Sequence, residues 1–196
     1  WIGATPGATI RNNSTSGHAF DRHVQTLALA GITNVSLDDL SWMTGTDHDF
    51  GIQPPYVLLV PGSAPQRPEK RWPHYAALAT QIAAHGFQPV ILGSADESAL
   101  AEQIIAAAPT ALNLCGRTQL TDIPALARHA AAAVGNDTGP MHMIAPTGCP
   151  ALVLFSAHSD PQRHAPRGAH VETLQSPHLQ DLTVTQVFKK MEMLSR

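Results

Sequence analysis

A short basic loop contains the first residues that could do chemistry. Of the chain's 12 lysines and arginines, three lie within residues 62–73, namely Arg67, Lys70 and Arg71. The loop begins with Gly62 and Ser63, directly after a run of apolar residues. Clustered cationic donors beside accessible backbone amides favour an anionic group such as a phosphate. The alternative is a basic loop that only faces solvent.

A second candidate is the segment Gly135-Asn-Asp-Thr-Gly-Pro-Met-His142, which joins an expected strand to an expected helix. The amides of Thr138 and Gly139 would lie at the helix N-terminus, where they suit a phosphate oxygen. Asp137 would repel a phosphate there, so we expect it to cap the helix or to accept hydrogen bonds from sugar hydroxyls. His142, one turn into the helix, either points back at this place or packs in the core.

A third candidate is the turn Gly93-Ser-Ala-Asp-Glu97, where carboxylates follow an expected strand. In nucleotide-binding sheets a carboxylate at this place accepts hydrogen bonds from the ribose hydroxyls. The alternative is a favourable negative charge at a helix N-terminus, which Asp96 or Glu97 could supply.

Composition and missing motifs exclude several classes of protein. The formal net charge is -3 and 43% of the 196 residues are hydrophobic, which is typical of a globular protein without affinity for nucleic acid. The two cysteines are too few for a disulfide framework and indicate a reducing compartment. No apolar run is long enough to span a bilayer. The sequence motifs of dinucleotide-binding proteins, Walker NTPases, hydrolases and zinc enzymes are absent. We also expect no metal, because the histidines lack metal-ligand spacing and Asp47-His48-Asp49 lies in a loose polar stretch.

The elements that would position these residues alternate along the chain. Helical patterns separate short apolar runs with strand character, which fall at residues 57–60, 88–92, 111–114, 131–134 and 151–155. This alternation is typical of a parallel sheet covered on both sides. We therefore expect a doubly wound α/β domain at residues 56–196, with ligands bound where the strands end. The polar residues 1–55 predict a connecting segment with one helix that begins near Phe20 and ends before Gly31.

The order of these motifs resembles the C-terminal half of glycosyltransferase family 9, the lipopolysaccharide heptosyltransferases. The matching blocks are Pro61-Gly-Ser63, Glu69-Lys-Arg-Trp-Pro73, Gly93-x-x-x-Glu97, Asn113-Leu-x-Gly116 and Asn136-Asp-Thr-Gly-Pro-Met-His142. The resemblance runs from about Tyr56 to the end. It implies one Rossmann-like half of a GT-B fold, with residues 1–55 as the connection from an N-terminal acceptor domain. Pro146 and Thr147 depart from the usual pattern, so we expect the last helix of these blocks to end near Ala145.

The resemblance also implies roles for individual residues towards an ADP-heptose donor. Ser63 and Lys70 would hold the diphosphate, together with the amides around Thr138 and Gly139.

Four further positions would hold the rest of the donor. Glu97 would accept hydrogen bonds from the ribose hydroxyls, and Thr118 would lie near the adenine. Asp137 would contact the sugar, and His142 would support that end of the pocket.

Family members invert the configuration at the sugar and bind the donor without a metal or other cofactor. The resemblance therefore implies heptose transfer to a lipid-linked oligosaccharide, the inner core of lipopolysaccharide, at the cytoplasmic face of the inner membrane with peripheral membrane contact. The general base would lie in the N-terminal domain, so we expect this chain alone to bind the donor without transferring heptose.

Two alternatives remain open at this stage. A related GT-B transferase or epimerase that uses a UDP-sugar would recognise a diphosphate through the same residue types. In a non-catalytic α/β nucleotide-binding or interaction module, the basic loop would merely face solvent.

Overall fold

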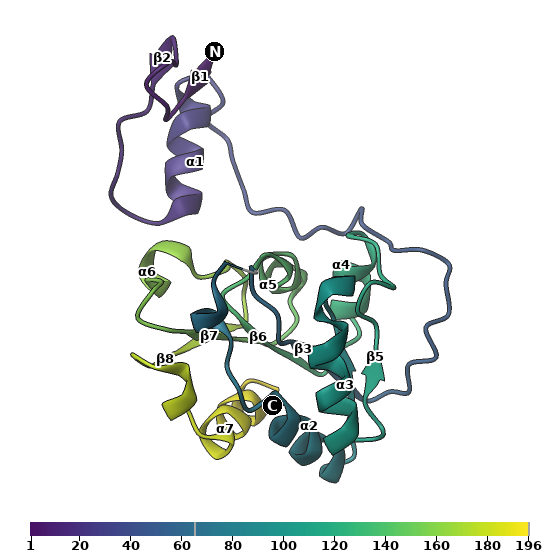
Figure 1. Ribbon diagram of the computed structural model, residues 1–196. Coiled ribbons are helices and arrows are strands. Elements are labelled where there is room, and N and C mark those ends of the chain that lie inside the picture. The colour runs from purple at the N-terminus through teal and green to yellow at the C-terminus, as the bar shows by residue number, and fades with distance from the viewer. Residues whose placement is uncertain (65, 196) are drawn as a thin grey trace.

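A parallel six-stranded sheet forms the centre of the computed structural model, which describes residues 1–64 and 66–195 (Figure 1). The strand order is β5-β4-β3-β6-β7-β8, and all neighbouring pairs are parallel. The strands are β3 (Tyr56–Val60), β4 (Gln88–Ile91), β5 (Leu112–Asn113), β6 (Ala132–Asn136), β7 (Ala151–Phe155) and β8 (Val171–Gln175).

Helices cover both faces of this sheet. One face packs against α2 (Tyr75–Ala84), α3 (Ser98–Ala107) and α7 (Val184–Leu194), and the other against α4 (Asp122–Ala127) and α5 (Gly139–Ile144) (Figure 1). Side chains alternate along a strand, so Val57 and Leu59 enter one core while Leu58 and Val60 enter the other. The expected doubly wound α/β fold is therefore confirmed.

The strand order reverses next to β3. The chain first builds outward from β3 to β5 and then returns to place β6 on the other side of β3, where Val57 pairs with Ala132. In open α/β sheets this reversal leaves a crevice at the carboxyl ends of the two central strands, and ligands bind there. The loops after β3 and β6 contain the basic loop and Asp137, so two candidate segments meet at this place.

The sheet extends further than the sequence patterns predicted. The structure adds α6 (Pro161–His164), β8 and α7 after residue 155, where no element was expected. The start of α7 is fixed by reciprocal capping, because Thr183 Oγ1 accepts from Gln186 N and Gln186 Oε1 accepts from Thr183 N. As expected, α5 ends early, at Ile144, and continues only as a 3₁₀ turn.

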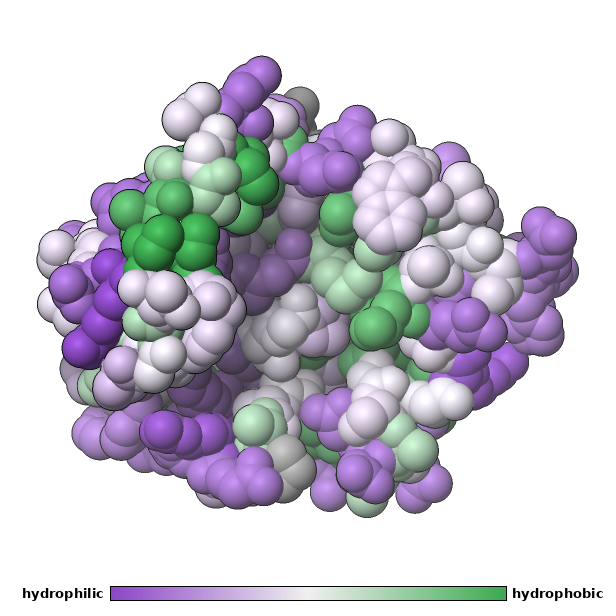
Figure 2. Space-filling view, turned by 90° about the horizontal axis from the view of Figure 1, so that it is seen from above, coloured by the Kyte–Doolittle hydropathy of each residue, from purple (hydrophilic) through white to green (hydrophobic). Residues whose placement is uncertain are grey.

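An N-terminal unit, residues 1–28, lies outside the sheet domain and comprises β1 (Ile2–Gly3), β2 (Ile10–Arg11) and α1 (Ala19–Ala28). The expected helix is thus confirmed, whereas the division between residues 55 and 56 stays a prediction. α1 buries none of its residues, and Figure 2 shows apolar surface gathered over this unit at upper left. The polar contacts between this N-terminal unit and the sheet domain involve His18, Arg163 and Arg167. Within the described ranges no helix is long and apolar enough to cross a membrane.

Residues 40–46 form a strap across α4. Arg128 donates hydrogen bonds to backbone carbonyls of this strap, and Asp122 Oδ1 accepts from Thr46 N at 2.6 Å. The other carboxylate oxygen of Asp122 accepts from Gln119 N at 2.7 Å. Burial alone would raise the pKa of Asp122, but these backbone hydrogen bonds outweigh it and lower the pKa below its usual value.

Candidate functional site

Asn136, the last residue of β6, joins the loops at the site and is completely buried. Its side-chain amide donates to Pro61 O at 2.8 Å and to Gly62 O at 3.1 Å. Its Oδ1 accepts from Trp72 N at 3.1 Å and from Tyr75 Oη at 3.2 Å. Asn136 therefore fixes both ends of the basic loop against β6, a role that the sequence analysis missed.

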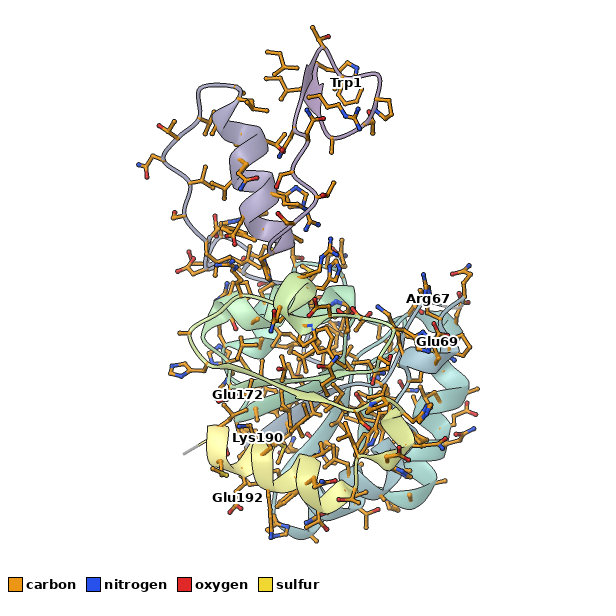
Figure 3. The ribbon with its side chains drawn as sticks, turned by 90° about the vertical axis from the view of Figure 1, so that its left-hand side faces the viewer. Trp1, Arg67, Glu69, Glu172, Lys190 and Glu192 are labelled. Carbon is orange, nitrogen blue, oxygen red and sulfur yellow. The ribbon has the colours of Figure 1, made fainter. Side chains whose placement is uncertain are left out.

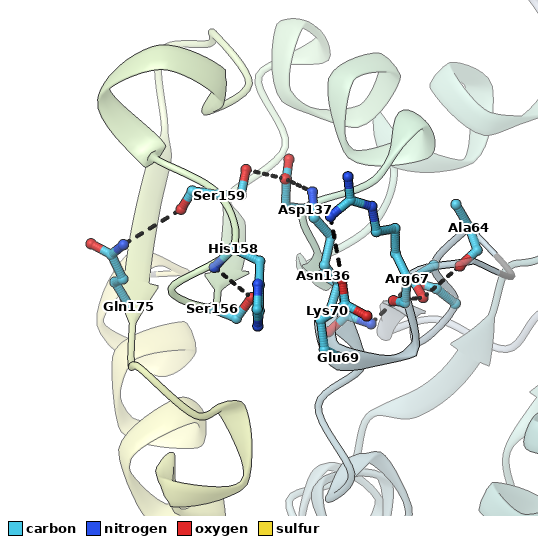
Figure 4. Close-up of polar contacts among 12 residues, drawn as sticks. Ala64, Arg67, Glu69, Lys70, Asn136, Asp137, Ser156, His158, Ser159 and Gln175 are labelled. Carbon is cyan, nitrogen blue, oxygen red and sulfur yellow. Dashed lines mark hydrogen bonds and ion pairs between the residues drawn. The ribbon is translucent and has the colours of Figure 1, made fainter.

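The three basic residues of the loop have different partners. Arg71 Nε donates to Ser63 Oγ at 3.0 Å, and this hydroxyl donates in turn to Arg67 O at 2.9 Å. Arg67 lies 3.5 Å from Glu69 in an exposed ion pair. Ser63 and Arg71 therefore shape the loop, and Lys70 is the basic residue that reaches across to β6 (Figure 4).

The centre of the site is an ion pair between Lys70 and Asp137. Lys70 Nζ lies 2.7 Å from Asp137 Oδ2, and the two side chains are only 20% and 10% exposed. The same oxygen accepts a hydrogen bond from Ser159 Oγ at 2.6 Å (Figure 4). Of the two roles considered for Asp137, helix capping is not realised, because Thr138 occupies the N-cap position and no side chain that the structure describes caps the helix. The carboxylate pairs with Lys70 instead, and the contact with a sugar stays a prediction.

The backbone after Asp137 begins α5. The first helical hydrogen bond here runs from Met141 N to Thr138 O at 3.1 Å, so the helix does not use the amides of Thr138 and Gly139. A Cβ placed on Gly139 would meet no atom within 4 Å. The space beside the Cα of Gly139 is therefore open, and the phosphate-binding role of the two amides stays a prediction.

Glu97 lies between the ends of β3 and β4. A Cβ on Gly62 would lie 1.4 Å from Glu97 Oε1, and one on Gly93 would lie 2.7 Å from Oε2, so the two glycines make room for the carboxylate. Glu97 Oε2 accepts from Ser94 N at 2.7 Å in a capping box. Glu97 therefore stabilises the start of a helical turn, which was the alternative considered for it, and its contact with the ribose stays a prediction.

Two cavities are lined by adjacent residues of this segment, one by Thr138 and the other by Asp137. One of about 410 Å³ is lined in part by Ser63, Glu97, Thr118 and Thr138. The other, of about 490 Å³, is lined in part by Arg67, Lys70, Asp137, His142, His158 and Ser159. Both volumes suit a small organic ligand. The structure thus divides most of the predicted residues between two cavities, whereas Gly139, the residue after Thr138, is in the lining of neither.

Histidines gather on the second cavity. Partial desolvation lowers the pKa of His142, and Asp137 acts in the opposite direction. His158 and His164 also line this cavity, and sequence reasoning missed them because they follow β7, beyond the motifs that were recognised. Across residues 1–64 and 66–195, no three His, Cys, Asp or Glu side chains are grouped so that they could hold a metal ion.

A doubly wound parallel sheet with a cationic loop, a carboxylate and two cavities at its strand reversal is typical of α/β domains that bind a ligand at this edge of the sheet. The sequence matches glycosyltransferase family 9 (heptosyltransferase) over residues 18–192. The chain therefore belongs to glycosyltransferase family 9.

Curated relatives agree with this assignment. The chain is 38% identical over 112 residues to lipopolysaccharide heptosyltransferase 2 of Escherichia coli K12. It is 36% identical over 112 residues to lipooligosaccharide heptosyltransferase 2 of Haemophilus influenzae. Each match covers 54% of this chain and 32% of the relative, so the matched region spans about a third of their length.

Solved structures show the same fold. The E. coli ADP-heptose LPS heptosyltransferase II is 28% identical with a TM-score of 0.68, over 83% of this chain and 52% of that one. An E. coli heptosyltransferase solved with ADP has a TM-score of 0.77 at 18% identity, over 95% of this chain and 60% of that one. The fold is that of the GT-B heptosyltransferases, as expected.

Proposed function

We propose that the protein transfers a heptose from ADP-heptose to the inner core of lipopolysaccharide, with inversion, and that this chain supplies the donor-binding part. The observation that carries this proposal is the Lys70–Asp137 pair at the β3/β6 crevice of a family 9 chain, in the wall of a cavity of ligand size. Lipid-linked oligosaccharide is the proposed acceptor. The proposed location is the cytoplasmic face of the inner membrane, with peripheral contact.

The nucleoside would occupy the 410 Å³ cavity. Thr118 would lie near the adenine, and Glu97 Oε1 would accept from the ribose because Oε2 is engaged by Ser94. The diphosphate would cross to the second cavity beside Ser63 and the amides of Thr138 and Gly139.

The sugar would then lie in the second cavity. Asp137 accepts hydrogen bonds from its hydroxyls, which explains a carboxylate beside a phosphate site, and His142 supports the wall there. Lys70 and the amides at the start of α5 neutralise the charge that develops on the departing ADP, so the proposed mechanism needs no metal. A general base from an acceptor-binding domain outside this chain would deprotonate the acceptor hydroxyl.

Calorimetric titration with ADP-heptose, ADP and UDP tests the proposal. We expect ADP-heptose and ADP to bind and UDP to bind more weakly, and we expect no heptose transfer by these 196 residues alone. Tighter binding of UDP would instead favour a UDP-sugar transferase or epimerase. Absence of any nucleotide binding would favour a non-catalytic interaction module. Turnover by the chain alone would contradict the proposal that the general base comes from another domain.

A further inference from the structure

Asp137 uses one of its two carboxylate oxygens for both of its side-chain partners. Lys70 Nζ lies 2.7 Å and Ser159 Oγ 2.6 Å from the same atom, Oδ2 (Figure 4). In the part of the chain that the structure describes, no hydrogen bond engages Oδ1. The carboxylate is therefore anchored through one oxygen, and the other is left for a further partner in a residue that lines the second cavity.

The Ser159 hydrogen bond joins two backbones that are already fixed. Asp137 N donates to Leu154 O at 3.2 Å, which ties the end of β6 to β7. Ser159 N donates to Ser156 O at 3.3 Å, and Gln175 Nε2 of β8 reaches Ser159 O at 3.5 Å. Little conformational entropy remains to be lost when a short serine side chain closes this contact.

Lys70 differs from Ser159 because its ammonium group has a second partner in the proposed function. In the proposed function its ammonium group neutralises the diphosphate, and a lysine on a flexible stem can reorient between a carboxylate and a phosphate. If Lys70 turned to the phosphate, the carboxylate of Asp137, only 10% exposed, would keep Ser159 as its remaining donor. A poorly solvated carboxylate without a donor would be unfavourable and free to rotate.

We propose that Ser159 is a positioning residue that holds Asp137 Oδ2 while Lys70 binds the diphosphate, so that Oδ1 accepts a hydroxyl of the transferred sugar. This inference rests on the proposed function and adds to it a residue that affects binding of the sugar rather than of the nucleotide. Ser159 therefore contributes to discrimination between a nucleotide sugar and the bare nucleoside diphosphate.

The test compares Ser159→Ala with Ser159→Thr, which keeps the hydroxyl, by titrating each variant of the protein with ADP-heptose and with ADP. Ser159→Ala weakens ADP-heptose binding about 10-fold, the size of one hydrogen bond to a charged group, and leaves ADP binding unchanged. Ser159→Thr restores the wild-type ratio of the two affinities. Ser156→Ala is the matched control, because Ser156 lies in the same loop and its hydroxyl accepts from His158 N rather than contacting Asp137.

Equal losses for both ligands in Ser159→Ala, or failure of Ser159→Thr to restore the ratio, would overturn the inference and leave the proposed function intact. Loss of the same ratio in Ser156→Ala would also overturn it, because the loop rather than the hydroxyl would then matter. Failure of the proposed function is seen separately, in the wild-type protein, as an absence of ADP-heptose binding, and the inference would fall with it.

Discussion

Replacing Lys70 with alanine removes the cation at the centre of the site. A hydrogen bond to a charged group contributes about 1.5–3 kcal/mol, so Lys70→Ala should weaken ADP binding about 10- to 150-fold. The change also leaves the carboxylate of Asp137 unneutralised beside the diphosphate, because Lys70 Nζ is its partner at 2.7 Å. We therefore expect the loss to lie towards the upper end of this range.

The two contributions can be separated with a double variant. Asp137→Asn in the Lys70→Ala background keeps a side chain of similar shape and removes the negative charge, so it should recover the part of the affinity that repulsion had cost. The lost hydrogen bond from Lys70 should not be recovered. A double-mutant cycle measured by calorimetry gives this coupling directly.

Lys190→Ala is the matched control for this experiment. Lys190 pairs with Glu172 at 3.2 Å, also as a lysine with a carboxylate, but this pair lies well apart from Arg67 in Figure 3 and is more exposed. Surface pairs contribute little, so Lys190→Ala should leave ADP affinity unchanged. An affinity of Lys70→Ala that matches this control would refute the argument and favour a solvated basic loop.

Three further predictions concern the glycines and the strap. Gly62→Ala should destabilise the protein by about 1–3 kcal/mol in urea unfolding, because its Cβ would lie 1.4 Å from Glu97 Oε1. Adding Glu97→Ala should recover much of the lost stability. No recovery would mean that another clash dominates. Gly139→Ala should keep the melting temperature, since its Cβ meets nothing within 4 Å, and weaken ADP binding; unchanged binding would place the diphosphate elsewhere. Asp122→Asn should cost about 1.5–3 kcal/mol at pH 7. Because the folded protein lowers the pKa of Asp122, this carboxylate stabilises the fold above about pH 4 and loses that effect below it, so the difference between variant and wild type should vanish in acid; a difference independent of pH would contradict this.

The central strands and their helices could be predicted because burial dictates them. Strands such as β7 are apolar on both faces, and this pattern survives in the sequence without knowledge of the neighbours. β8 was not predicted because it is an edge strand of sequence Val-Glu-Thr-Leu-Gln, which is half exposed and has no continuous apolar run. The 3₁₀ turn before α3 and the start of α7 did leave a visible signal, since Ser94-x-x-Glu97 and Thr183-x-x-Gln186 are capping boxes.

The residue types of the site were predictable, but their pairings were not. Lys70 and Asp137 were each selected for a chemical reason, yet nothing local in the sequence indicates that they form an ion pair across the β3/β6 crevice. Ser63 was expected to hold the diphosphate, and this stays a prediction; that its hydroxyl bonds to Arg71 and Arg67 within the loop could not be read from the sequence. Ser159 could not be found, because its importance depends on the turn after β7 that brings it to Asp137.

The reversal of strand order has a consequence for folding. β3, β4 and β5 with their helices are assembled from neighbouring segments, whereas the β3/β6 pairing joins Val57 to Ala132 only after a long stretch of chain has been closed. Non-local pairings of this kind form slowly. We expect the β3/β6 pairing to form late during folding and to break early during unfolding. The ligand crevice would then exist only once the whole sheet has assembled.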